Sequence, residues 1–123
     1  MPRILLIEDD EQLRMMLRQA LELSGHDVTE AANGNEGLVA FRQARTDLVV
    51  TDIMMPQKDG IETIRELRRD FPETRIIAIT GFRGVYNRLP AAEYLGAKRT
   101  LVKPFSVQDF LHTVQDVLSK DRA

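Results

Sequence analysis

Acidic side chains follow two short apolar runs of this sequence. The run 4–7 leads directly into Glu8 and Asp9, and the run 48–50 is separated from Asp52 by a single threonine. Carboxylate oxygens are the ligands that hard cations such as Mg²⁺ prefer. We interpret Asp52 as the reactive group, because buried strands flanked by helices carry their ligands beyond their carboxyl ends.

Each of these runs is of strand length and too short for a helix. Two further runs end on Thr80 and on Lys103, and a weaker alternation predicts an edge strand before Ala32. The sequence therefore predicts five strands, at 4–7, 27–31, 48–52, 76–80 and 100–102.

Apolar residues at helical spacing separate the strands. Asp10, Asp59 and Ser106 are good N-caps for three of the helices. A second helix, with the apolar stripe Leu38, Phe41 and Ala44, is expected after a turn at 33–35, and a short fourth helix is expected at about 88–95. Met15, Met16, Met54 and Met55 are predicted to be packing residues.

The regular alternation of strand and helix predicts an α/β fold, with a parallel sheet covered by helices on both faces. The carboxyl ends of all strands then lie at one edge of the sheet. Adjacent strands are about 4.8 Å apart, so carboxylates from neighbouring strand ends can converge on one ion. That edge collects Glu8, Asp9, Asp52, Thr80 and Lys103.

Length and composition limit the alternatives. We expect residues 1–123 to form one domain, since no linker, repeat or low-complexity segment interrupts the chain. A net charge of -2 gives no basic field for nucleic acid or an anionic membrane. The absence of cysteine excludes disulfides and thiolate metal sites, and no apolar run approaches the roughly 20 residues that span a bilayer. Cytoplasmic residence is the expectation.

These motifs, taken in order, resemble the CheY-like receiver domain of bacterial two-component response regulators. The resemblance covers essentially the whole chain, and it implies a flavodoxin-like, doubly wound (βα)5 fold with strand order 2-1-3-4-5 and five helices. The motifs that carry it are Ile4-Leu5-Leu6-Ile7-Glu8-Asp9-Asp10, Asp52-Ile53-Met54-Met55-Pro56, Asp59-Gly60, Ala78-Ile79-Thr80, Gly96-Ala97 and Leu101-Val102-Lys103-Pro104-Phe105.

The resemblance also implies a role for each acid. Asp52 would accept a phosphoryl group from a histidine kinase or a phosphotransfer protein. Mg²⁺ would be held by Glu8, Asp9, Asp52 and the backbone carbonyl of Met54, with Glu8 acting through water. No catalysis is expected beyond the domain's own phosphorylation and dephosphorylation.

On the same grounds, Thr80 and Lys103 would contact the phosphoryl oxygens, and the Lys103-Pro104 bond would be cis. Phosphorylation would reshape the face formed by the fourth helix, the fifth strand and the fifth helix, so that it binds an effector that the sequence does not identify. No direct contact with nucleic acid or membrane is expected.

The sequence departs from the family at positions that matter for switching and dephosphorylation. Thr100 stands where relatives usually have an aromatic residue that acts as a switch. The usual coupling between a flip of that aromatic ring and the hydroxyl of Thr80 is therefore in doubt. Met54 and Phe82 are apolar where relatives often have polar groups that position water, so we expect slow self-dephosphorylation.

Two other functions compete with this interpretation. A Mg²⁺-dependent phosphatase of the haloacid dehalogenase type needs a second aspartate two residues after its nucleophile, and Met54 stands there. A receiver-fold interaction module that phosphorylation does not control would normally have lost part of the acid, acceptor and lysine set. All of that set is present here.

Overall fold

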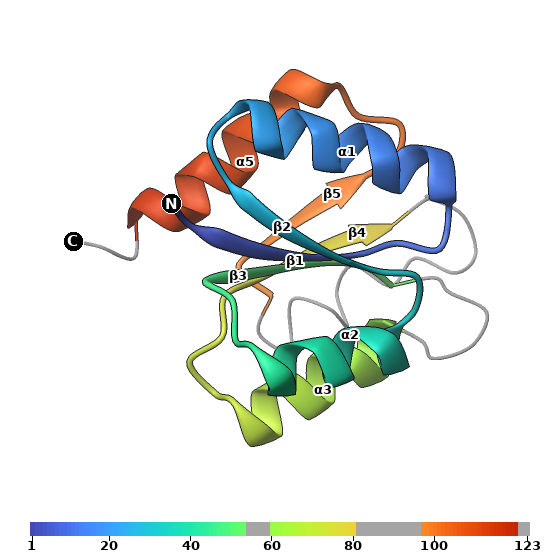
Figure 1. Cartoon of the computed structure of the whole chain (residues 1–123), viewed down its shortest axis with the longest axis vertical. Helices are drawn as coiled ribbons and strands as arrows, with labels where there is room; N and C mark the ends of the chain where they lie inside the picture. The colour runs from blue at the N-terminus through green and yellow to red at the C-terminus, as the bar shows by residue number, and fades with distance from the viewer. Residues whose placement is uncertain (54–59, 81–96, 121–123) are drawn as a thin grey trace.

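The computed structural model describes residues 1–53, 60–80 and 97–120, and in them one five-stranded parallel sheet with the order β2-β1-β3-β4-β5 (Figure 1). The strands are β1 (Arg3–Ile7), β2 (Asp27–Ala31), β3 (Leu48–Asp52), β4 (Ile76–Thr80) and β5 (Arg99–Val102). The described helices are α1 (Glu11–Leu23), α2 (Gly34–Gln43), α3 (Gly60–Asp70) and α5 (Val107–Lys120). The predicted α/β class and strand order are confirmed, and the fourth helix expected at 88–95 lies outside the described residues.

Helices cover both faces of the sheet, with α1 and α5 on one face and α2 and α3 on the other (Figure 1). Alternate residues of β1 serve the two cores: Leu5 and Ile7 pack with α2 and α3, whereas Ile4 and Leu6 pack with α1 and α5. Every residue of β3 and β4 is buried, as expected for central strands covered on both faces.

Side chains at the helix N-termini satisfy backbone N–H groups that have no partner within the helix. Asp10 Oδ1 accepts from the Leu13 N–H at 3.1 Å, as its position before α1 predicted. The expected turn at 33–35 is wrong, because Asn33 is itself an N-cap. Its Oδ1 accepts from the Glu36 N–H at 2.9 Å, and α2 begins at once.

Two methionines that were predicted to be packing residues are exposed. Met15 and Met16 expose 46% and 43% of their surface, because the inward stripe of α1 passes through Leu17 and Leu21 instead. Ala44 was also expected to face inward, but it is an exposed C-cap. No helix in the described ranges is both long enough and apolar enough to cross a bilayer.

Gly60 allows α3 to begin directly against the end of β3. A Cβ at this position would lie 2.2 Å from the Asp52 carbonyl oxygen and 2.4 Å from the Ile53 Cα. Both contacts are with backbone, which cannot turn away as a side chain can. The first turn of α3 therefore fixes where the strand end that carries Asp52 is placed.

Gly60→Ala should lower the free energy of unfolding by about 2 kcal/mol, because the added methyl group must displace backbone. Urea unfolding of the purified variant measures the loss. Gly37→Ala is the matched control. Its Cβ would clash only with the Ile7 side chain, and alanine favours a helix interior by about 1 kcal/mol over glycine. Equal losses in the two variants would show that the contact with β3 is not the constraint.

Candidate functional site

Hydrogen bonds between neighbouring strands continue beyond the strands and hold their carboxyl ends together. The Glu8 N–H donates to the Ala31 carbonyl at 3.0 Å, and the Lys103 N–H donates to the Thr80 carbonyl at 2.7 Å. Between them, β1 and β3 run side by side, with Ile7 opposite the residue before Asp52. The edge predicted from the sequence is therefore present, and its five described candidate side chains emerge from adjacent strands.

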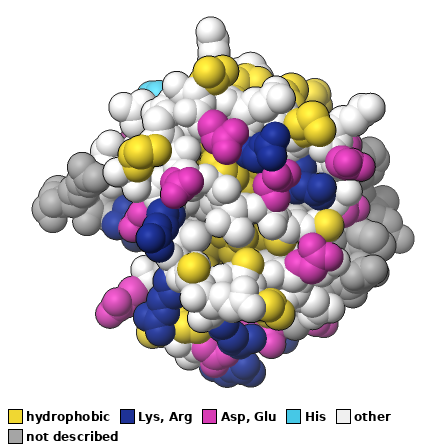
Figure 2. Space-filling view, in the orientation of Figure 1, with side chains coloured by type: hydrophobic (Ala, Val, Ile, Leu, Met, Phe, Trp, Pro, Cys, Tyr) yellow, Lys and Arg dark blue, Asp and Glu magenta, His cyan; other side chains and the backbone are white. Residues whose placement is uncertain are grey.

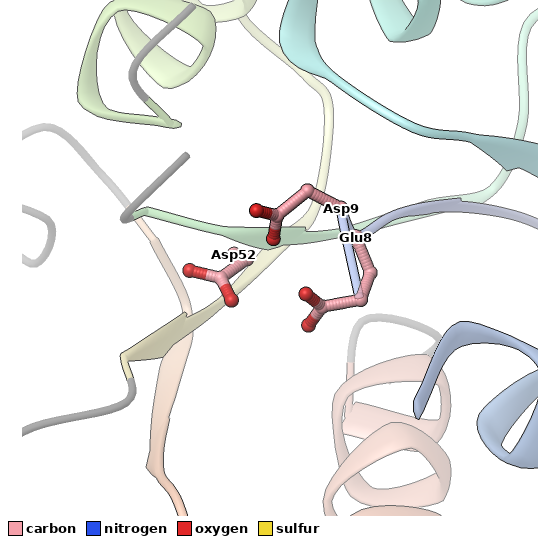
Figure 3. A group of neighbouring side chains, drawn as sticks. All are labelled: Glu8, Asp9 and Asp52. Carbon is pink, nitrogen blue, oxygen red and sulfur yellow. The ribbon is translucent and has the colours of Figure 1, made fainter. Parts of the chain in front are cut away.

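Three carboxylates meet at this edge. Glu8, Asp9 and Asp52 each offer an oxygen, and these oxygens all lie within 4.8 Å of one another (Figure 3). Glu8 is fully buried and Asp52 is 2% exposed, whereas Asp9 is open to solvent. A cation could therefore enter from solvent on the side of Asp9 and be bound by the two buried acids on the other side.

Crowding of like charges makes this cluster unfavourable when nothing neutralises it. Two unit charges about 4 Å apart cost roughly 4 kcal/mol at an effective dielectric near 20. Burial and the charge of Asp52 raise the pKa of Glu8 to about 8, despite the opposing hydrogen bond from the Asp10 N–H and the charge of Lys103. Glu8 thus holds a proton at neutral pH when no cation replaces it.

Lys103 partly neutralises the cluster. Its Nζ donates to Asp52 Oδ2 at 2.7 Å and lies 3.1 Å from Glu8 Oε1. Burial alone would lower the pKa of Lys103, but the hydrogen bond to Asp52 and the charges of both acids outweigh it and raise the pKa. The amine therefore stays charged. The Lys103-Pro104 peptide bond is cis, as the resemblance implied.

Thr80 brings a hydroxyl to the same edge. The residue is 1% exposed, and its Oγ1 has no hydrogen-bond partner within the described part of the chain. A buried hydroxyl without a partner costs about 1–3 kcal/mol. Such a group is suited to donate to an atom that the protein itself does not supply.

The donor set fits a small, hard divalent cation. Carboxylate oxygens are the preferred ligands of Mg²⁺, and this cluster offers three of them. The expected fourth protein ligand, the backbone carbonyl of Met54, lies outside the described residues. Phe82, expected at the rim of the site, lies outside them as well.

Sequence reasoning missed Arg14, which reaches the site from α1. Its Nη1 donates to the Glu8 carbonyl at 2.8 Å, although Glu8 lies six residues earlier in the chain. An arginine on the polar side of an amphipathic helix usually indicates a solvated surface. The sequence therefore carried no signal for this contact.

Comparisons with known proteins agree with the fold. A family model for the response regulator receiver domain matches residues 4–115. The probable transcriptional regulator ycf27 of Porphyridium aerugineum is 37% identical over 118 residues, which make up 96% of this chain and 48% of that protein. The chain thus spans about half the length of the first curated relatives it matches.

Solved structures of receiver proteins superpose on nearly the whole chain. The CheY-like receiver domain protein from Methanospirillum hungatei aligns with a TM-score of 0.92 and 27% identity, over 99% of this chain and 97% of that one. The response regulator TrrA from Thermotoga maritima, in complex with Mg²⁺ and BeF, aligns with a TM-score of 0.84 and 30% identity, over 95% and 99%. With its family match, strand order and acidic edge in agreement, the chain belongs to the response regulator receiver domain family.

Proposed function

We propose that this chain, as a single receiver unit, accepts a phosphoryl group on the carboxylate of Asp52 in a Mg²⁺-dependent reaction. The donor is a histidine kinase or a phosphotransfer protein. The observation that carries the proposal is the environment of Asp52. A buried carboxylate lies 2.7 Å from the Lys103 amine and within 4.8 Å of the oxygens of two further acids.

In the proposed reaction, a carboxylate oxygen of Asp52 attacks the phosphorus atom. The bond from phosphorus to the donor's imidazole nitrogen breaks, its electron pair stays on that nitrogen, and an aspartyl phosphate forms. Lys103 faces the reacting oxygens as a point charge and offsets the charge that gathers there.

Glu8, Asp9, Asp52 and the backbone carbonyl of Met54 are the groups that would hold Mg²⁺. Held by these groups, Mg²⁺ would neutralise charge during phosphoryl transfer. The solved TrrA structure, which is 30% identical to this chain, is a complex with Mg²⁺ and BeF, and this supports Mg²⁺ as the cation.

The phosphorylated state would engage groups that the resting state leaves without partners. A phosphoryl group adds strong acceptor oxygens, and the buried Thr80 hydroxyl is a donor that lacks a partner among the described residues. Movement of Thr80 would be passed to β5, whose Lys103 N–H donates to the Thr80 carbonyl. We propose that the face formed by the fourth helix, β5 and α5 changes in this way and binds a downstream effector.

Thr100 in β5 offers no aromatic ring to report the movement, so the coupling would run through the backbone of β4 and β5, which pair from Ile77 to Thr80. An interaction module that phosphorylation does not control has no supporting observation, since Asp52, Lys103 and both metal-binding acids are together. The slow self-dephosphorylation expected from Met54 and Phe82 stays a prediction.

Asp52→Asn should abolish phosphorylation by acetyl phosphate and Mg²⁺, because the amide replaces the attacking oxygen. Intact mass spectrometry should detect one added phosphoryl group on the wild-type protein and none on the variant. Asp47→Asn is the matched control, since this exposed aspartate precedes the opposite end of β3. The control should be phosphorylated like the wild type. Phosphorylation of Asp52→Asn, or a wild-type protein that stays unmodified, would contradict the proposed acceptor.

Mg²⁺ affinity should rise as the pH increases from 6 to about 8 and level off above that, because the ion must displace the proton that Glu8 holds. The slope should approach about tenfold per pH unit. Amide chemical shifts recorded during Mg²⁺ titrations measure the affinity. The metal-free protein should lose stability as the pH rises from 4.5 to about 8, since the raised pKa makes the folded state hold the proton more tightly than the unfolded chain does.

Glu8→Gln is the control for this pH profile, because an amide cannot ionise. Its Mg²⁺ affinity should be weaker and should vary less with pH. A wild-type profile that is level between pH 6 and 8, or an equal slope in Glu8→Gln, would show that another group controls the affinity.

Thr80→Val should raise the free energy of unfolding by about 1 kcal/mol in the unphosphorylated protein, because it removes a buried hydroxyl that has no described partner. The same variant should show smaller amide shift changes on addition of Mg²⁺ and beryllofluoride. Thr80→Ser keeps the hydroxyl and should retain those changes. A loss of stability in Thr80→Val would mean that the hydroxyl is already bonded in the resting state.

A further inference from the structure

Arg14 contacts the acidic loop, residues 8–10, at two points. Its side-chain Nη1 donates to the Glu8 carbonyl at 2.8 Å, and its backbone N–H donates to the Asp10 carbonyl at 2.8 Å. The side chain is only 17% exposed. The backbone bond is the ordinary bond of the first helical turn, so the bond to the Glu8 carbonyl is what the Arg14 side chain adds.

Glu30 holds the guanidinium of Arg14 in place from β2. Its Oε1 accepts from Arg14 Nε at 3.1 Å, and its Oε2 accepts from Arg18 Nη1 at 2.8 Å. Both oxygens of this carboxylate are therefore used by arginines of α1. Figure 2 shows acidic and basic side chains interleaved on the face of the molecule that carries α1 and β2.

The Glu8 carbonyl belongs to the peptide unit that joins Glu8 to Asp9, and a peptide unit is planar. A hydrogen bond that fixes this oxygen therefore also fixes the direction in which the backbone enters Asp9. The other side of Glu8 is fixed by its N–H, which donates to the Ala31 carbonyl. The side chain folds back over the loop, with Glu8 Oε2 accepting from the Asp10 N–H at 3.1 Å.

We propose that Arg14, oriented by Glu30, is a positioning residue that holds the acidic loop in the geometry that binds Mg²⁺. This inference rests on the proposed function, because it assigns Arg14 a part in forming the same metal site. Arg14 touches no reacting atom and acts only through the backbone of Glu8. Mutation of groups that orient metal ligands in this way commonly lowers metal affinity by about tenfold to a hundredfold.

Electrostatics alone predicts the opposite effect. Arg14 is a positive charge next to an acidic cluster, so its removal should strengthen the attraction for a cation. Positioning predicts weaker binding, because the loop loses the bond that fixes its peptide plane. The sign of the change therefore separates the two explanations.

The test is a Mg²⁺ titration of the full chain, followed by amide chemical shifts, on the wild type, Arg14→Met and Arg18→Met. Arg18 is the matched control, since it binds the same carboxylate and carries the same charge but has no described contact with the loop. We expect Arg14→Met to weaken Mg²⁺ binding about tenfold. Arg18→Met should change it by less than about twofold, as is typical of exposed ion pairs.

Two further variants keep the test valid if Arg14→Met folds poorly. Arg14→Lys keeps the charge but has only one nitrogen, so it cannot bond to Glu30 and to the Glu8 carbonyl as arginine does. Glu30→Gln leaves Arg14 in place but weakens the ion pair that orients it. Both should weaken Mg²⁺ binding by less than Arg14→Met does. Binding by Arg14→Met that equals or exceeds the wild type, or an equal loss in Arg18→Met, would overturn the inference.

Failure of the inference and failure of the proposed function give different results. If the wild type binds no Mg²⁺, or if Asp9→Asn binds it as well as the wild type does, the proposed metal site is wrong. If the wild type binds Mg²⁺ and Asp9→Asn does not, the site stands. The Arg14 and Arg18 variants then decide the inference alone.

Discussion

Repulsion among three carboxylates at the carboxyl ends of β1 and β3 is the constraint on which the rest of the structure depends. Ile7 pairs with Thr51. The residues that follow them in the chain, Glu8 and Asp52, therefore lie side by side, and both are almost fully buried. Water cannot screen such charges well. A proton on Glu8 and the ammonium group of Lys103 reduce the repulsion instead. A cation could displace the proton on Glu8, whereas the Lys103 ammonium would stay beside Asp52.

The fold withstands this repulsion because the strands that carry it are the best packed parts of the molecule. All residues of β3 and β4 are buried, and the residues of β1 alternate between the two cores. Each fully buried Leu, Ile or Val contributes about 1.5–3 kcal/mol, so a few of these side chains offset the cost of crowding the acids. Gly60 adds a steric limit, since the start of α3 leaves the end of β3 no room to withdraw.

Strand ends could be found from the sequence because short apolar runs are a local signal, and parallel connections bring all carboxyl ends to one edge. The order of the strands came from the family resemblance, since periodicity alone does not determine it. Errors arose where tertiary contacts decide the outcome. Met16 lies one step off the stripe that faces α5, and Asn33 begins a helix where its neighbours suggested a turn. Arg14 was missed because it lies on α1 and its partner Glu30 is 16 residues away on β2.

The crowding of the three carboxylates also determines how a cation would enter the site. In the resting structure Lys103 lies between Asp52 and Glu8, so a divalent cation that takes these oxygens must displace a proton from Glu8 and share Asp52 with the amine. The proton that leaves Glu8 would be replaced by a divalent charge, and the phosphoryl group of the proposed reaction would bring the negative charge that balances it. The Thr80 hydroxyl, which lacks a described partner at rest, can then bond to that group. The resting pocket is thus stabilised in part by a proton that the proposed reaction would remove, and this would couple ion binding, phosphorylation and the movement of β5 into one equilibrium.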